Sequence, residues 1–211
     1  MNNSVDIKIA HINNANQINN ALNKSLVFEI LSKTNYEALT PHYKFQQIWV
    51  NQCYATFKDF DTYLILMYLK NKVFVDYSDR FHYMSIDVFY SQDKVALDKI
   101  NLIQISKSLN IPKETIRRKI NFLQDKKIIF RLGKSIYLNS KALEIVKPNK
   151  SLPMLAIFFE KISNILSKED WFEKSINRED VEKFIKDHYT VCWEYFYRFQ
   201  IPYLTRHRKN E

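Results

Sequence analysis

The chain has 211 residues, of which 46% are apolar and 15% aromatic, with a formal net charge of +9 and a single glycine. This apolar content is enough to form a core, which excludes an intrinsically disordered chain. Because loops that cradle phosphate need several glycines, the single glycine excludes P-loop and dinucleotide-binding folds.

Residues 14–92 form the predicted N-terminal helical region. Asparagines crowd the sequence around its start, and we expect residues 1–13 to be disordered or loosely ordered. Within the region, apolar residues recur at helical spacing. This periodicity predicts helices over 15–31, 43–57 and 61–78 and a short helix within 81–91.

Residues 101–111 are predicted to form a short helix that ends in a sharp turn. Asn101 can serve as the N-cap, and Gln104, three residues later, can reach back to it in a variant of the capping box. Asn110 lies where the chain must turn, and asparagine tolerates the left-handed conformation that such a turn requires.

A second helix is predicted over 112–127, and Pro112 suits its first position. Its inward stripe at i, i+4 and i+7 consists of Ile116, Ile120 and Leu123. A helix fits the major groove of DNA, where Arg or Lys can bond guanine and Asn can bond adenine. We therefore expect base contacts from the outward residues Lys113, Glu114, Arg117, Arg118 and Asn121.

The pattern then changes to that of two strands, 128–132 and 135–138. Gly133 stands between them, and a tight hairpin needs a residue that accepts positive φ. Arg131 and Lys134 lie at or near the hairpin tip, where a wing would meet the DNA backbone or the minor groove. We expect backbone contacts from Gln104, Lys107, Thr115, Arg131, Lys134 and Ser135.

The positive charge is concentrated in this part of the sequence. Residues 93–150 contain 14 basic and 5 acidic residues, whereas the rest of the chain contains 18 of each. All of the excess charge therefore lies in about a quarter of the chain. A phosphate polyanion is the natural partner of such a field, because each neutralised phosphate releases counterions.

Two short helices, a turn and a basic-tipped hairpin, in this order, resemble the winged helix-turn-helix transcription regulators. The segment Ile-Pro-Lys-Glu-Thr-Ile-Arg-Arg-Lys-Ile at 111–120, followed by Leu-Gln-Asp-Lys-Lys-Ile-Ile at 123–129, is most similar to the Crp/Fnr and DeoR types. The resemblance covers about 40 residues. It implies a DNA-binding unit in which one helix enters the major groove.

The resemblance also implies residue roles. The positions that match base-contacting residues of these families are Lys113, Glu114 and Arg118, and those that match backbone-contacting residues are Thr115 and Arg117. Pro112 replaces the usual small hydroxyl residue before the recognition helix, and Asn110 replaces the usual turn glycine. The rest of the chain resembles neither a cyclic-nucleotide-binding β-roll nor the sugar-phosphate-binding part of DeoR proteins, so the effectors of these families do not transfer.

The C-terminal region, 149–211, is predicted to hold two long helices and a basic tail at 206–209. We expect the first helix over 151–166 and the second from about 177 until Pro202 ends it. The inward face of the second helix is predicted to consist of Val181, Phe184, Ile185, His188, Cys192, Tyr195, Phe196 and Phe199. We interpret the abundant aromatic residues as core, with an effector pocket or a helical dimer interface as the alternative.

The sequence shows no pattern typical of a disulfide framework, a metal site, a catalytic site or a membrane span. Cys53 and Cys192 are far apart, which predicts two reduced thiols in a cytoplasmic protein, and the five histidines lack metal-ligand spacing. No nucleophile with a matching base is evident, so we expect no enzyme activity, no cofactor and no metal. The apolar runs fall short of the ~20 residues that a membrane span needs, and no secretory signal is evident.

Together these patterns predict a mainly α protein in which a winged helix-turn-helix unit, 93–148, lies between helical regions. The expected function is sequence-specific binding of double-stranded DNA by a homodimeric transcription regulator, with a small-molecule effector in the helical region as a further expectation. One alternative is a replication initiator or maintenance factor of a plasmid or phage type, which two tandem winged units would favour. The other is a winged helix that docks a protein.

Overall fold

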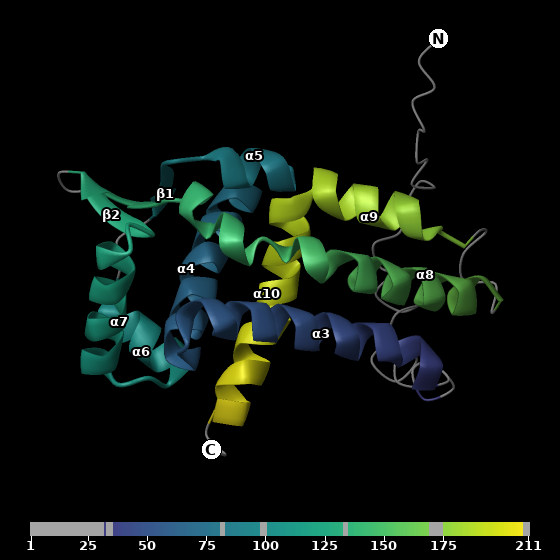
Figure 1. The fold of residues 1–211 in the computed structure, drawn as a ribbon, viewed down its shortest axis with the longest axis horizontal. Coiled ribbons are helices and arrows are strands. Elements are labelled where there is room, and N and C mark those ends of the chain that lie inside the picture. Colours follow the sequence, from purple (N-terminus) through teal and green to yellow (C-terminus); the bar gives the residue numbers. More distant parts are fainter. Residues whose placement is uncertain are drawn as a thin grey trace, which may run out of the picture.

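The computed structural model describes residue 32 and residues 36–80, 83–97, 101–132, 135–168 and 175–208. These residues form a mainly helical fold with a small antiparallel sheet (Figure 1). The predicted helix over 15–31 and the segment 1–13 lie outside the described residues.

Among the described residues, three helices precede the sheet, and they confirm most of the N-terminal pattern predicted there. Helix α3 spans Tyr36–Phe57, so it begins earlier than predicted and includes Pro41. Helix α4 spans Phe60–Asp79, and its N-cap Asp59 accepts a hydrogen bond from the Thr62 amide at 2.7 Å. The short helix α5 spans Ile86–Ser91.

The two predicted short helices are present. Helix α6 spans Leu102–Leu109, and the side chain of Asn101 caps it by accepting from the backbone amides of residues 103 and 104. The predicted return bond from Gln104 to Asn101 is wrong, because Gln104 Oε1 accepts instead from Lys72 Nζ of α4 at 3.3 Å. Asn110 is left-handed, with φ 54° and ψ 37°, as its place in the turn predicts.

Helix α7 follows as Lys113–Asp125 and buries the predicted stripe of Ile116, Ile120 and Leu123. Pro112 is the N-cap residue rather than the first helical residue, and it supplies no side-chain bond to the helix end. The first turn of α7 therefore leaves its amide groups without a side-chain cap.

The sheet has three strands in the order β1-β3-β2. Strands β2 (Ile129–Leu132) and β3 (Ser135–Leu138) confirm the two predicted strands, while Gly133 and Lys134 between them lie outside the described residues. Strand β1 (Val95–Leu97) was not predicted, because three residues are too few to display a strand pattern. It pairs antiparallel with β3, with Ala96 opposite Tyr137.

The chain continues through two 3-10 helices, η1 (Lys141–Val146) and η2 (Pro148–Lys150), into helix α8 (Leu152–Lys168). Helix α9 spans Arg178–Asp187 and helix α10 spans Tyr189–His207. The single long helix predicted from residue 177 is therefore two helices that meet at His188.

This break corrects the predicted inward face. Because α10 is a separate helix, its buried face does not continue the buried face of α9. The stripe that α10 buries consists of Tyr189, Trp193, Tyr197, Ile201 and Leu204. Three residues assigned inward are exposed instead: Phe184, Tyr195 and Phe199. His188 is exposed as well, so its expected place on the apolar face is also wrong.

Pro202 does not end α10, which continues to His207. A proline inside a helix cannot donate its backbone bond to the carbonyl four residues earlier, here that of Arg198. Pro202 and Arg198 are both exposed, so they lie on the solvent side of α10. Water can bond the freed carbonyl there, which explains why the helix tolerates the proline.

Helix α4 lies at the centre of the fold. Its buried residues include the consecutive run from Thr62 to Met67, which faces neighbours on every side. It packs most extensively against α10 and also contacts α3, α6, α7 and β1. Buried residues from Phe45 to Leu204 form one core cluster, so the segment 93–148 shares its core with the helical regions.

The left-handed turn at Asn110 generates a stability prediction. Asn110→Ala should lower the free energy of unfolding by about 1 kcal/mol, because a Cβ without a polar group is disfavoured in this conformation. Asn110→Gly should be at least as stable as the wild type. Urea denaturation of the two variants measures the difference, and equal stability of the alanine and glycine forms would contradict the prediction.

Candidate nucleic-acid interface

Helices α6 and α7 and the sheet lie at one end of the molecule, away from α8 and α9 (Figure 1). Burial of the apolar stripe of α7 turns the opposite face of the helix to solvent. All five predicted base-contacting residues are exposed: Lys113, Glu114, Arg117, Arg118 and Asn121. The structure thus brings them together on one accessible helix.

Two of these residues bond each other. Arg117 Nη2 lies 2.9 Å from Glu114 Oε1, and their side chains are 55% and 73% exposed. An ion pair this exposed stabilises a helix by about 0.3–0.5 kcal/mol. The guanidinium of Arg117 is therefore free to exchange the carboxylate for a stronger acceptor.

The predicted backbone-contacting residues lie on adjoining elements. Gln104 and Lys107 are exposed on α6, and Arg131 and Ser135 are exposed on the two strands of the hairpin. Thr115 is half-buried in the first turn of α7. Lys134 lies outside the described residues.

Lys119 is a cation of α7 that points toward the helical body. Its Nζ lies 3.0 Å from Asp59 Oδ2, at the start of α4, and the two side chains are only 20% and 29% exposed. Burial alone would raise the pKa of Asp59, but hydrogen bonds from Thr62 and Lys119 outweigh it and lower the pKa. This ion pair joins α7 to the corner between α3 and α4.

Arg208 makes a second set of contacts between elements that are distant in the sequence. Its Nε donates to Asp61 Oδ1 at 2.6 Å and its Nη2 to Asp61 Oδ2 at 3.2 Å. Its Nη1 donates to the backbone carbonyl of Asn110 at 3.1 Å. One guanidinium therefore connects α10, α4 and the turn that leads into α7, and the predicted basic tail is partly a structural brace.

These ties shape the charge of the surface. Asp59 and Asp61 are each paired with a cation, whereas the outer surface of α6, α7 and β2 carries exposed cations. The exposed cations of this surface are Lys107, Lys113, Arg117, Arg118, Lys126, Lys127 and Arg131. Glu114 and Asp125 are its exposed carboxylates on α7, so the surface is net positive.

The roles of Lys119 and Arg208 were missed at the sequence level. Helical spacing does place Lys119 between the outward and inward faces, so its boundary position could have been found. Nothing near Arg208 in the sequence points to Asp61 or Asn110, because these contacts span 147 and 98 residues.

Comparison of the chain with protein-family models, with curated proteins and with solved structures gave no match. Within the described ranges, none of the helices has both the length and the apolar composition of a bilayer span. Over the same ranges, no three His, Cys, Asp or Glu side chains gather as a metal site. The function must therefore be inferred from this surface.

The brace formed by Arg208 can be tested. Arg208→Ala should lower the free energy of unfolding by about 1 kcal/mol, because the bidentate pair with Asp61 is partly buried. It should also speed amide hydrogen exchange around residues 108–111. Arg80→Ala, which removes an exposed i,i+4 pair with Asp76, is the matched control and should cost about 0.5 kcal/mol or less. Unchanged exchange in the turn would show that Arg208 does not hold it.

Proposed function

We propose that the protein binds double-stranded DNA through a winged helix-turn-helix unit and regulates transcription as a homodimer. Helix α7 would enter the major groove, and the hairpin of β2 and β3 would lie beside it as the wing. The exposed cationic face of α7, packed next to that hairpin, is the observation that carries the proposal.

The order of the elements supports the proposal. Helices α6 and α7 pack against each other across a short turn, and β2 begins just after α7. The sheet contains the hairpin of β2 and β3, and β1 pairs with the inner strand of that hairpin. This arrangement gives the recognition helix and the wing a common rigid support.

The charge distribution also supports a polyanionic partner. Phosphate contacts position a protein on the duplex, and base contacts then specify the sequence. On α7 the long donors Arg117, Arg118 and Asn121 are suited to base edges. The cations Lys107 on α6 and Arg131 on β2 flank them and are suited to phosphates on either side.

The homodimer is part of the proposal because two recognition helices on two half-sites give a regulator its affinity and its palindromic operator. Two tandem winged units would have favoured a replication initiator. The described residues contain one three-stranded sheet, which is enough for one such unit. In the protein-docking alternative, a partner or the chain's own helices would cover the outer face of α7. The helices of the described residues leave that face exposed, so a separate partner would have to cover it.

Base reading by α7 makes a specific prediction. After selection of preferred sequences from random duplex DNA, Arg118→Ala should weaken binding to the selected site by about 5- to 150-fold, equivalent to about 1–3 kcal/mol, and relax preference at one position. Arg131→Ala should weaken binding to every sequence alike and reduce the slope of affinity against salt by about 1.

Lys183→Ala provides the control, because Lys183 is exposed on α9, far from α7 (Figure 1). It should change neither the affinity nor the salt slope. Equal loss on every sequence for Arg118→Ala would refute its role in base reading. Absence of any salt-dependent binding to duplex DNA would refute the proposed function and favour protein docking.

A further inference from the structure

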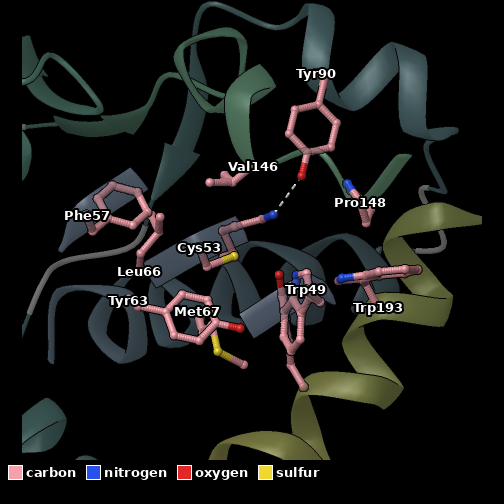
Figure 2. Close-up of a pocket in the computed structure, with 12 residues that line it drawn as sticks. Trp49, Cys53, Phe57, Tyr63, Leu66, Met67, Tyr90, Val146, Pro148 and Trp193 are labelled. Carbon is pink, nitrogen blue, oxygen red and sulfur yellow. Dashed lines mark hydrogen bonds between the residues drawn. The ribbon is translucent and has the colours of Figure 1, made fainter. Parts of the chain in front are cut away.

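A small, mostly enclosed cavity lies where α3, α4, α5, α10 and the 3-10 helices meet (Figure 2). Aromatic side chains form most of its wall, among them Trp49, Tyr63, Tyr90 and Trp193. About 10 Å³ of the cavity is open to the centre of a water-sized sphere, which is room for one water molecule or one small ion. An organic effector does not fit this cavity.

Lys70 of α4 lines this cavity and is only 4% exposed. Its Nζ lies 3.1 Å from the hydroxyl of Tyr90, the contact drawn as a dashed line to that residue in Figure 2, and 3.3 Å from the hydroxyl of Tyr189. The two hydroxyls lie 3.1 Å apart. The three polar atoms therefore form a closed triangle in the core.

This triangle has more donors than acceptors. A protonated amine and two phenols carry five donor hydrogens. The three contacts of the triangle use one hydrogen each. Among the described residues no other atom accepts from these three groups, so two hydrogens remain without an acceptor. Even a neutral amine, with two hydrogens, leaves one donor unsatisfied.

Another donor faces the same space. Tyr63 also lines the cavity, and the neighbour of its buried hydroxyl is the thiol of Cys53, which is only a weak acceptor. Buried polar groups in native proteins are almost always bonded to protein, water or an ion. The arrangement therefore requires an acceptor inside the cavity.

The charge of the cavity decides which acceptor it favours. No carboxylate among the described residues pairs with Lys70, and the rings of Phe74, Phe89, Tyr90, Tyr189 and Tyr197 surround its Nζ at 5.2–5.9 Å. Ring faces attract a cation, but the hydrogen bonds that they accept are weak. A buried cation with free donors and no counter-charge is suited to an anion.

The other titratable groups around Lys70 do not supply a negative charge. Burial raises the pKa values of the Cys53 thiol on α3 and of the tyrosine hydroxyls on α4, α5 and α10, so these groups stay neutral near pH 7. Near Tyr90, the carboxylates of Asp87 and Glu144 are 2.8 and 3.2 Å from Lys147 Nζ and are neutralised by it. Glu194, buried on α10, pairs with Arg198 at 2.7 Å.

We propose that this cavity is a binding site for one small inorganic anion of about the size of chloride, held by Lys70 and the hydroxyls of Tyr90 and Tyr63. Chloride is a monatomic anion that is somewhat larger than water, and it accepts several hydrogen bonds from different directions. The site goes beyond DNA binding and does not depend on it.

Binding of the anion is coupled to protonation of Lys70. In the empty site, burial lowers the pKa of Lys70 from 10.5 to about 7. An anion in contact with Nζ favours the charged amine, so the protein takes up the anion and a proton together. Chloride should therefore bind more tightly below pH 7 than at pH 9.

The test compares thermal unfolding of the full chain in sodium chloride and in sodium gluconate at equal ionic strength, without DNA. Gluconate is too large for the cavity. The wild-type Tm should rise saturably with chloride, by about 3 °C at roughly ten times the dissociation constant. The chloride effect should disappear in Lys70→Met and weaken in Tyr63→Phe, while the exposed control Lys183→Met keeps it.

Crystals grown in sodium bromide give a second measurement. Anomalous scattering should place one bromide next to Lys70 Nζ in the wild type and none in Lys70→Met. Equal Tm values in chloride and gluconate, together with no anomalous peak in the cavity, would overturn the proposal and assign the cavity to water. This result would leave the proposed DNA binding untouched, because none of the mutated side chains lies on the outer face of α7.

The pH dependence of stability tests the state of Lys70 itself. In gluconate, the wild-type free energy of unfolding should rise between about pH 7 and pH 10, since over this range the unfolded lysine binds a proton that the folded lysine has lost. Below pH 7 both states are protonated and this contribution is constant. Lys70→Met should lack the rise. A chloride effect that is the same at pH 6 and pH 9 would refute the coupling.

Discussion

Burial of α4 on all sides is the constraint on which the rest of the structure depends. A helix that is apolar around its whole circumference cannot remain at a surface, so other elements must cover each of its faces. In this protein α10 covers the longest part, and α3, α6, α7 and β1 cover the remainder. The candidate DNA-binding helices are thereby fixed to the same element that carries the polar cluster around Lys70.

Ion pairs at the N-terminal end of α4 fix the orientation of the elements that pack against it. Apolar contacts are not directional, and they leave the angle of a surface helix weakly determined. The pairs Asp59–Lys119 and Asp61–Arg208 fix α7 and the turn before it relative to α4. They also neutralise both carboxylates, which leaves the outward surface of α7 positive.

The polar cluster around Lys70 differs from these ion pairs. In the described part of the chain, hydroxyls and aromatic rings surround Lys70 and no carboxylate pairs with it, at a position 4% exposed to solvent. A buried charge of this kind destabilises the fold unless a counter-charge or a lost proton compensates for it. The proposed anion supplies that compensation without any change in the packing of α4.

The sequence by itself determined the local elements. Strong helical periodicity, the N-cap at Asn101 and the tolerance of Asn110 for a left-handed turn all act within a few residues, so α6, α7 and the strands around Gly133 were predictable. The exposed set on α7, from Lys113 to Asn121, followed from the same periodicity.

Only the tertiary structure decided the remaining features, because they depend on residues far apart in the chain. The break at His188 resets which face of α10 is buried, and the contact with α4 selects Tyr189, Trp193 and Tyr197 over Tyr195 and Phe199. Strand β1 exists because β3 offers it a hydrogen-bonding edge. The polar triangle joins side chains up to 119 residues apart, and no local pattern encodes such a meeting.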